Sequence, residues 1–135
     1  MAEPMNATLC PCGSARPYAS CCGALHQSFS EEGQLLAASA EALMRSRYSA
    51  FVLDLRPYLL ATWHPRTRPT HLEPPEPGLR WLGLEVQEAV QQDALHASVR
   101  FVARSKLAGR AHRLVETSRF ECIGGSWFYV DGLCA

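Results

Sequence analysis

Four of the chain's six cysteines lie within the fourteen-residue stretch CPCGSARPYASCCG, residues 10–23. One residue separates the first two cysteines, eight residues follow, and the last two are adjacent. Two prolines and two glycines interrupt the stretch, which predicts an irregular knuckle over residues 10–26 rather than a helix or a strand. So short a segment has no hydrophobic core of its own, and we expect a bound metal ion to supply its folding energy.

The spacing of these cysteines predicts one structural zinc ion per chain. A structural zinc site takes four thiolate or imidazole ligands in a tetrahedron. Gly13 allows a tight turn behind the first pair of cysteines, and Gly23 relieves the bend at the second pair. The predicted ligands are Cys10, Cys12, Cys21 and Cys22. Four thiolates leave no open coordination position, so the expected role of the metal is structural and not catalytic.

Other uses of the cysteines fit the pattern less well. Adjacent cysteines such as Cys21 and Cys22 bond each other badly, because a disulfide requires a specific geometry. The chain contains no CxxC pair, which argues against a redox dithiol, and the spacing is unusual for an iron–sulfur cluster. His26 lies four residues beyond Cys22 and remains an alternative ligand. We interpret Cys122 as a small buried hydrophobic residue and Cys134 as a tail residue.

Composition excludes several classes of partner. The 135 residues carry 13 basic and 13 acidic side chains, so the chain lacks the basic footprint of a nucleic-acid or membrane-surface protein. No apolar run approaches the ~20 residues that a transmembrane helix needs, and the N-terminus has no signal-peptide pattern. We therefore expect a cytoplasmic protein. In that reducing compartment clustered cysteines bind metal more often than they form disulfides.

The sequence predicts two units. Residues 1–26 would contain a polar leader, residues 1–9, followed by the zinc knuckle, and residues 27–135 would form the main domain. Within the main domain helical patterns come first and alternating patterns follow. This order is typical of an α+β fold in which helices pack on a curved antiparallel sheet.

The helical part of the main domain is expected over residues 36–55, where apolar residues recur with a period of 3.6. Ser28 and Glu31 resemble a capping box before it. A second, short helix is expected around residues 55–63, ending before a proline. Residues 65–80 contain five prolines and are expected to be irregular.

The apolar period then changes to two, which predicts strands. Leu82, Leu84 and Val86 are expected on one face of the first strand. Further strands are expected over residues 95–104, 110–122 and 127–130, with a hairpin turn at Gly124-Gly125.

The cysteine stretch resembles the SEC-C motif, a zinc knuckle found at the C-terminus of the SecA translocase and in many small bacterial proteins. The usual form is close to CPCGSGKKYKKCCG, and the resemblance implies zinc held by the four cysteines. This copy departs at positions 15, 17, 19 and 20, where glycine and lysines are common, and Arg16 is its one basic residue. A knuckle with so little positive charge is poorly suited to bind RNA or an acidic partner.

Most of the remaining chain is similar to the YchJ-like family of uncharacterised bacterial proteins. The similar segments, in order, are LMRSRYSAF (43–51), YLLATWHP (58–65), WLGLEV (81–86), VRFVAR (99–104), ETSRFE (116–121) and GSWFYVDG (125–132). The resemblance implies an SEC-C knuckle followed by a nuclear-transport-factor-two-like (NTF2-like) domain, also called a cystatin-like cone. Members often carry a second SEC-C copy at the C-terminus, which we expect this chain to lack. That fold implies no particular activity.

The concave side of such a sheet, closed by helices, is the natural place for a pocket. Its candidate lining residues are Arg45, Arg47, Tyr48, Trp63, His64, Trp81, Arg104, Arg119, Tyr129 and Asp131. In an enzyme, His64 would act as a base oriented by Asp131 or Glu116, and an arginine would bind an anionic substrate.

Structural roles explain the same residues more simply. Arg45 and Arg47 lie two apart and point in different directions, so one should be solvated and the other paired with Glu116, Glu121 or Asp131. The aromatic residues fit a core better than a cofactor site. His64 could cap the end of the short helix.

Two functions remain open from the sequence. The first is a non-catalytic adaptor that binds a protein partner and contains a structural zinc. The second is an enzyme or small-ligand binder that uses the cone interior around His64 and Asp131. An adaptor should have its interior filled by aromatic side chains, whereas an enzyme should leave a polar cavity.

Overall fold

The computed structural model describes residues 8–134. Residues 1–7 of the expected polar leader lie outside this range. The elements, in order, are a short 3-10 helix η2 (Tyr18–Ser20), helices α1 (Cys22–Glu32), α2 (Ala40–Leu53) and α3 (Arg56–Ala61), and strands β1 (Arg80–Gln91), β2 (His96–Leu107), β3 (Arg110–Ile123) and β4 (Ser126–Cys134).

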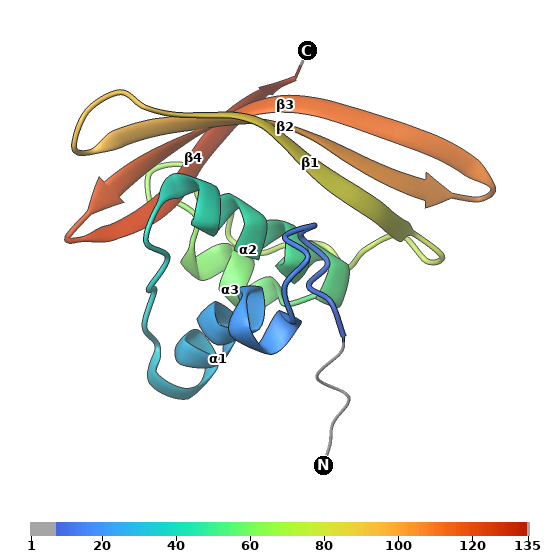
Figure 1. Ribbon diagram of the computed structural model, residues 1–135, viewed down its shortest axis with the longest axis horizontal. Helices are drawn as coiled ribbons and strands as arrows, with labels where there is room; N and C mark the ends of the chain where they lie inside the picture. The colour runs from blue at the N-terminus through green and yellow to red at the C-terminus, as the bar shows by residue number, and fades with distance from the viewer. Residues whose placement is uncertain (1–7, 135) are drawn as a thin grey trace.

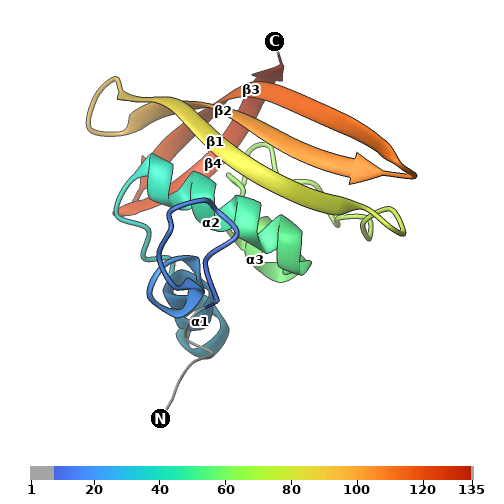
Figure 2. The same ribbon diagram turned by 45° about the vertical axis from the view of Figure 1, so that its right-hand side comes forward.

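The strands form one antiparallel sheet in the order β1-β2-β3-β4, so each strand pairs with its neighbour in sequence. The sheet is curved, and the helices lie on its concave side, with α2 directly beneath it (Figure 1). The view turned by 45° shows α1 as the layer farthest from the sheet (Figure 2). The expected α+β cone, a cysteine-rich knuckle followed by helices on a curved antiparallel sheet, is confirmed.

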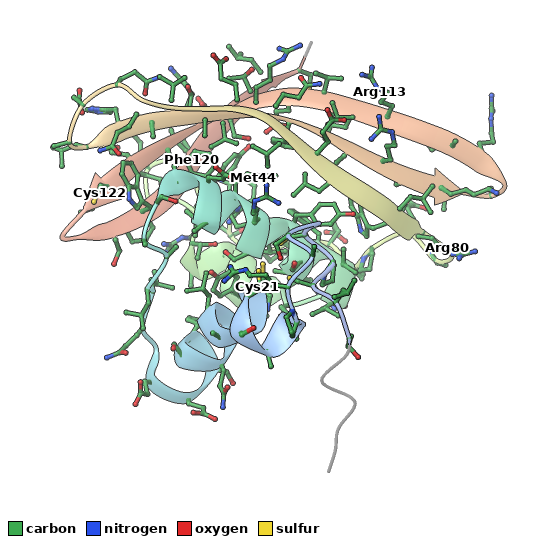
Figure 3. The ribbon with its side chains drawn as sticks, in the orientation of Figure 1. Cys21, Met44, Arg80, Arg113, Phe120 and Cys122 are labelled. Carbon is green, nitrogen blue, oxygen red and sulfur yellow. The ribbon has the colours of Figure 1, made fainter. Side chains whose placement is uncertain are left out.

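The main core fills the space between α2 and the sheet. Leu43 and Met44 of α2 pack against Val99 and Phe101 of β2 and against Phe120 of β3, and all five are buried. Figure 3 shows Met44 and Phe120 in this space. Arg113 projects from the opposite face, as the alternation of side chains along a strand requires.

The start of the helical part differs from the expectation. The knuckle becomes regular at Cys22, where α1 begins, so the expected boundary between residues 26 and 27 falls inside a helix. Ser28 lies within α1 and caps nothing, because α1 continues to a left-handed cap at Gly33 (φ 69°). The cap of α2 is Ser39, whose Oγ accepts the backbone N–H of Ala42 at 3.1 Å.

The first strand also differs from simple alternation. Leu82 is 53% exposed instead of sharing the inner face with Leu84 and Val86. A register shift between Trp81 and Gly83 is the reason: it turns Trp81 toward the core and Leu82 to solvent.

The segment after α3 extends the sheet at its β4 edge. Trp63 forms a parallel bridge with Tyr129. The His64 N–H donates to the Tyr129 carbonyl at 2.7 Å, and the Tyr129 N–H donates to the Thr62 carbonyl at 2.9 Å. These bonds bring Trp63 and Tyr129 together at the wall of the cone. Within residues 8–134, no helix is long and apolar enough to cross a membrane.

Candidate functional site

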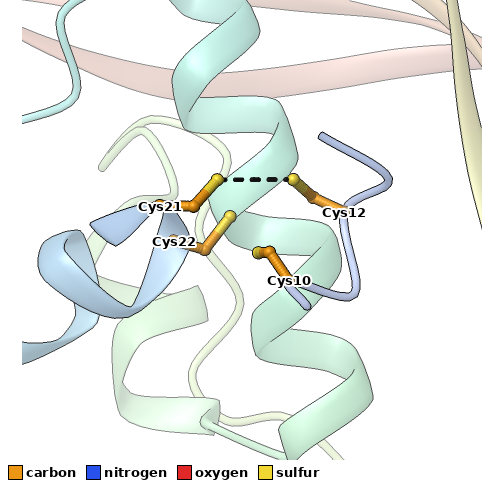
Figure 4. A group of neighbouring side chains, drawn as sticks. All are labelled: Cys10, Cys12, Cys21 and Cys22. Carbon is orange, nitrogen blue, oxygen red and sulfur yellow. Dashed lines mark hydrogen bonds between the residues drawn. The ribbon is translucent and has the colours of Figure 1, made fainter. Parts of the chain in front are cut away.

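The knuckle brings its two pairs of cysteines together from opposite directions. The Cys10 N–H donates to the Arg16 carbonyl at 2.8 Å, and a bridge joins Leu9 to Pro17, so the first pair sits on a closed loop. The second pair, Cys21 and Cys22, stands at the start of α1. Figure 4 shows all four side chains pointing toward a common centre, beside α2.

The spacing of the four sulfur atoms matches a tetrahedral metal site. We call Cys10, Cys12, Cys21 and Cys22 the four-cysteine cluster; their sulfurs all lie within 4.8 Å of one another. A tetrahedron with Zn–S bonds of ~2.3 Å separates its sulfurs by about 3.8 Å, and the Cys12 and Cys21 sulfurs are 3.7 Å apart. That distance is far too long for a disulfide, and all four cysteines are free. The cluster could therefore hold a metal ion.

Burial acts to raise the pKa values of the buried thiols in the cluster, whereas hydrogen bonds from neighbouring groups act to lower the pKa values of Cys10 and Cys12. Cys10, Cys12 and Cys22 are buried, and Cys21 is half-buried. The hydrogen bond between the two thiols lowers the pKa of Cys12 and raises the pKa of Cys22. Zinc binds the thiolate form of cysteine, so metal binding would displace the protons of these thiols.

Polar side chains surround the sulfur atoms. Arg16 Nη2 lies 3.5 Å and Ser14 Oγ 3.2 Å from the sulfur of Cys21. On the buried side, Ser49 Oγ of α2 lies 3.5 Å from the sulfur of Cys10. These donors offset the negative charge of a thiolate cluster.

His26 does not belong to the four-cysteine cluster. Its Nε2 donates to the Ser46 carbonyl at 2.9 Å, and its Nδ1 accepts the Tyr18 hydroxyl at 2.7 Å. Both ring nitrogens are therefore engaged, and the side chain ties α1 to α2. The alternative in which His26 serves as a ligand does not fit this geometry.

Two further contacts pack the knuckle against the cone. Arg45 of α2 donates from Nη1 to the Cys12 carbonyl at 2.8 Å. At Gly13 (φ 83°), an added Cβ would lie 3.1 Å from the Leu84 carbonyl of β1, so the backbone of the knuckle approaches the sheet closely. Contacts rather than a linker fix the position of the four-cysteine cluster.

A second site lies inside the cone, where a cavity of about 190 Å³ remains between α2 and the sheet. Five of the ten expected lining residues surround it. They are Arg47, Tyr48, Trp63, Trp81 and Tyr129. The expected lining does not include Ser118 or Glu116, and Glu116 is expected only as a partner of His64 or of an arginine. The alternation of both residues with outward-facing residues along β3 is the signal that could have placed them in the wall.

The structure does not bring the other five expected residues into the cavity. Arg45 faces the knuckle, and Arg104 lies 3.9 Å from Glu85 on the outer face of the sheet. Arg119 Nε donates to Asp131 Oδ1 at 2.6 Å, so these two residues pair with each other.

His64, the fifth, pairs with neither of its expected acidic partners. His64 Nε2 lies 2.7 Å from Oε1 of Glu121, and its Nδ1 accepts the backbone N–H of Arg66 at 3.0 Å. His96 Nε2 approaches the other carboxylate oxygen of Glu121 at 3.6 Å. The expected His64–Asp131 or His64–Glu116 pair is therefore replaced by His64–Glu121, a contact that unites a loop and a strand far apart in the sequence.

Fold and site together define a class: a four-cysteine knuckle of the SEC-C type joined to an NTF2-like cone. The SEC-C motif matches residues 8–24, and the family model described as the YchJ middle NTF2-like domain matches residues 39–132. The chain belongs to this YchJ-like family, whose curated relatives carry the name UPF0225.

Relatives support this assignment over nearly the whole chain. A UPF0225 protein from Methylibium petroleiphilum is 61% identical over 124 residues, 91% of this chain and 86% of its own length. A UPF0225 protein from Bordetella bronchiseptica is 54% identical over 132 residues, 96% of each chain.

Solved structures share the architecture. The solution structure of a SEC-C motif-containing protein from Rhodopseudomonas palustris has a TM-score of 0.80 and 29% identity, covering 95% of this chain and 99% of that one. The crystal structure of a SEC-C motif-containing protein from Psychrobacter arcticus has a TM-score of 0.76 and 28% identity, covering 96% of this chain and 84% of that one.

Proposed function

We propose that this chain is a non-catalytic interaction module in which the four-cysteine cluster binds one structural zinc ion. The observation that carries the proposal is the convergence of four free cysteines, with all sulfurs within 4.8 Å of one another. Zinc suits this ligand set because four thiolates at tetrahedral spacing match its preferred coordination. With all four positions taken by protein, the metal has no site for a substrate and serves to hold the knuckle on the cone.

The surroundings of His64 and Asp131 favour a non-catalytic role for these residues. Each nitrogen of His64 is occupied, one by the Arg66 N–H and the other by Glu121. A general base needs a free lone pair within reach of the proton that it removes. Asp131 is held by Arg119 on the outer face, so it cannot orient His64.

The proposal favours a protein partner over nucleic acid, and a cytoplasmic location. Arg16, the one basic residue of the motif, donates a hydrogen bond to the sulfur of Cys21. Its positive charge is therefore directed at the four-cysteine cluster and not at a partner. Neither the motif nor the chain as a whole then offers the positive charge that phosphate binding requires. A reducing cytoplasm would keep the four thiols available to the metal.

The metal content of the protein tests the proposal. Chain purified under reducing conditions should contain about one zinc per molecule by inductively coupled plasma mass spectrometry. Cys12→Ser should lose that zinc, because it removes a buried ligand. The matched control is Cys134→Ser, which should keep the zinc because Cys134 is exposed and lies outside the four-cysteine cluster. Wild-type protein with much less than one zinc, or a control that also loses the metal, would contradict the proposal.

The interaction role has its own test. A protein partner should co-purify from the native host with wild-type chain and with Cys134→Ser but not with Cys12→Ser. The same partner, purified separately, should rebind with the same dependence. If the partner binds Cys12→Ser as tightly as it binds wild type, the knuckle is not needed for the interaction.

A further inference from the structure

The cavity inside the cone has the size of a small molecule. Its volume of about 190 Å³ falls below the ~300–1,000 Å³ typical of drug-sized ligands and exceeds the ~150 Å³ that holds benzene. Most of the wall is aromatic or aliphatic, with residues from α2, from each of the four strands and from the segment after α3. A molecule with one ring would fit.

A buried arginine forms the main polar part of the wall. Arg47 is 6% exposed, and its Nη1 donates to the Leu59 carbonyl at 2.8 Å and to Thr62 Oγ1 at 2.7 Å. The guanidinium lies 5.1 Å from the centre of the Trp63 ring and 4.6 Å from that of Tyr129. These contacts fix the orientation of the guanidinium and offset part of the cost of burying it.

The charge of Arg47 has no salt-bridge partner within residues 8–134. Both of its hydrogen bonds to described residues use Nη1, and it forms no salt bridge with a described carboxylate. Burial lowers its pKa to about 10, so it remains a cation at neutral pH. Trp63, in the same wall, has a buried Nε1–H without a hydrogen-bond partner among these residues. Buried donors without acceptors are rare in folded proteins and point to a missing acceptor.

Glu116 lines the same cavity, and its charge raises the pKa of Arg47 against the larger effect of burial, but the two residues form no salt bridge. Its Oε2 accepts the Ser118 hydroxyl at 2.6 Å. Gly132 leaves room for this arrangement, because an added Cβ there would collide with the Glu116 carboxylate. Glu116 is therefore held by β3 and β4, and the guanidinium keeps its capacity for a ligand.

We propose that the cone cavity binds a small planar aromatic monoanion: one ring that stacks among the aromatic wall residues and one carboxylate that pairs with Arg47. This site goes beyond the proposed zinc-containing interaction module and does not involve the four-cysteine cluster. The ring would enter past Phe51 and Leu114, which line the cavity and are 41% and 39% exposed.

Fluorine NMR with 4-fluorobenzoate tests the site directly on the 135-residue chain purified with zinc. The expected result is saturable binding with a Kd of about 1 mM or tighter, as suits a ligand of this size. The neutral analogue 4-fluorobenzyl alcohol should bind about tenfold more weakly or worse, because it lacks the charge-assisted hydrogen bond. Equal binding of the two probes, or no binding of 4-fluorobenzoate at millimolar concentration, would overturn the proposal.

Three variants locate the bound probe. Arg47→Met should weaken 4-fluorobenzoate binding about tenfold or more. Glu116→Gln, which keeps an acceptor for Ser118 and removes a negative charge, should bind the probe at least as tightly as wild type. Leu114→Trp fills the mouth without touching Arg47 and should block binding even if Arg47→Met fails to fold. Full binding by Leu114→Trp, or equal loss in Arg47→Met and Glu116→Gln, would contradict the proposed site.

Discussion

Arg45 donates a hydrogen bond of 2.8 Å from Nη1 to the carbonyl oxygen of Cys12. The same guanidinium uses Nε to pair with Glu41, one turn earlier on α2, at 3.0 Å. One side chain thus connects the main helix of the cone to the backbone between the two pairs of cysteines. The knuckle and the cone are coupled through this contact.

Replacing Arg45 should measure that coupling. We expect Arg45→Leu to lower the free energy of unfolding by about 1–3 kcal/mol, because it leaves a partly buried carbonyl without its donor. Urea denaturation provides the measurement. Arg104→Leu is the matched control, since Arg104 is exposed and 3.9 Å from Glu85, and should change stability by less than about 0.5 kcal/mol. If the free energy of unfolding falls equally in the two variants, the hydrogen bond to Cys12 does not contribute to stability.

Gly23 offers a test of how tightly the knuckle is packed. An added Cβ would lie 2.6 Å from the Tyr18 carbonyl and 2.8 Å from its ring. Gly23→Ala should therefore destabilise the protein by about 1–3 kcal/mol, although alanine favours a helix over glycine. Gly83→Ala, where the added Cβ meets nothing within 4 Å, should be neutral or slightly stabilising. Thermal unfolding that shows the same sign for both would contradict the close contact with Tyr18.

The four-cysteine cluster could be predicted because its cysteines are local in sequence. Their spacing and the glycines beside them carry enough information to place four sulfurs around one point. The side chains that support the cluster carry no such signal. Ser49 and Arg45 reach Cys10 and Cys12 from α2, 39 and 33 positions away, and only the packing of α2 brings them there.

The register of the sheet is a second feature that the sequence alone does not predict. Gly124-Gly125 predicts the hairpin, and counting back from that turn would place Asp131 opposite Ser118. Asp131 instead lies opposite Arg119, because the register shifts between Arg119 and Phe120. Leu82 turns outward for a similar reason in β1. Alternation predicts the strands, but an irregularity of one residue decides which face each side chain occupies.

The engaged nitrogens of His64 predict a structural role for this residue. His64→Ala should lower the free energy of unfolding by about 1–3 kcal/mol, because Glu121 and the Arg66 N–H lose a buried partner. His71→Ala is the matched control: His71 is exposed and bonded to the equally exposed Glu73, so its loss should cost less than about 0.5 kcal/mol. If chemical denaturation finds His64→Ala as stable as this control, the structural role of His64 is contradicted.

The Arg119–Asp131 pair predicts a specific pH dependence. The hydrogen bond from Arg119 lowers the pKa of Asp131 below its ordinary value. Because the folded pKa lies below the unfolded value, the pair stabilises the fold at neutral pH, and this contribution is lost as the pH falls through the folded pKa. The effect is small, since water screens an exposed pair.

Thermal unfolding of wild type and Arg119→Met at a series of pH values checks this dependence. The difference in Tm should be constant near neutral pH and shrink toward zero below about pH 4. The two proteins differ only at residue 119, so the difference in Tm isolates the contribution of the pair. If the difference in Tm grows as the pH falls, the proposed contribution of the Arg119–Asp131 pair is contradicted.

Removal of the metal should loosen the knuckle and α1 first. Residues 8–32 contribute few buried apolar side chains to the main core, whereas β2 and β3 pair along their full lengths and carry much of that core. Hydrogen–deuterium exchange after treatment with a zinc chelator should therefore show lost protection over residues 8–32 and retained protection in β2 and β3. Added zinc should restore the protection. Uniform loss across the sheet would instead show that the knuckle and the cone fold as one cooperative unit, with the four-cysteine cluster, Arg45 and Ser49 forming part of a single core.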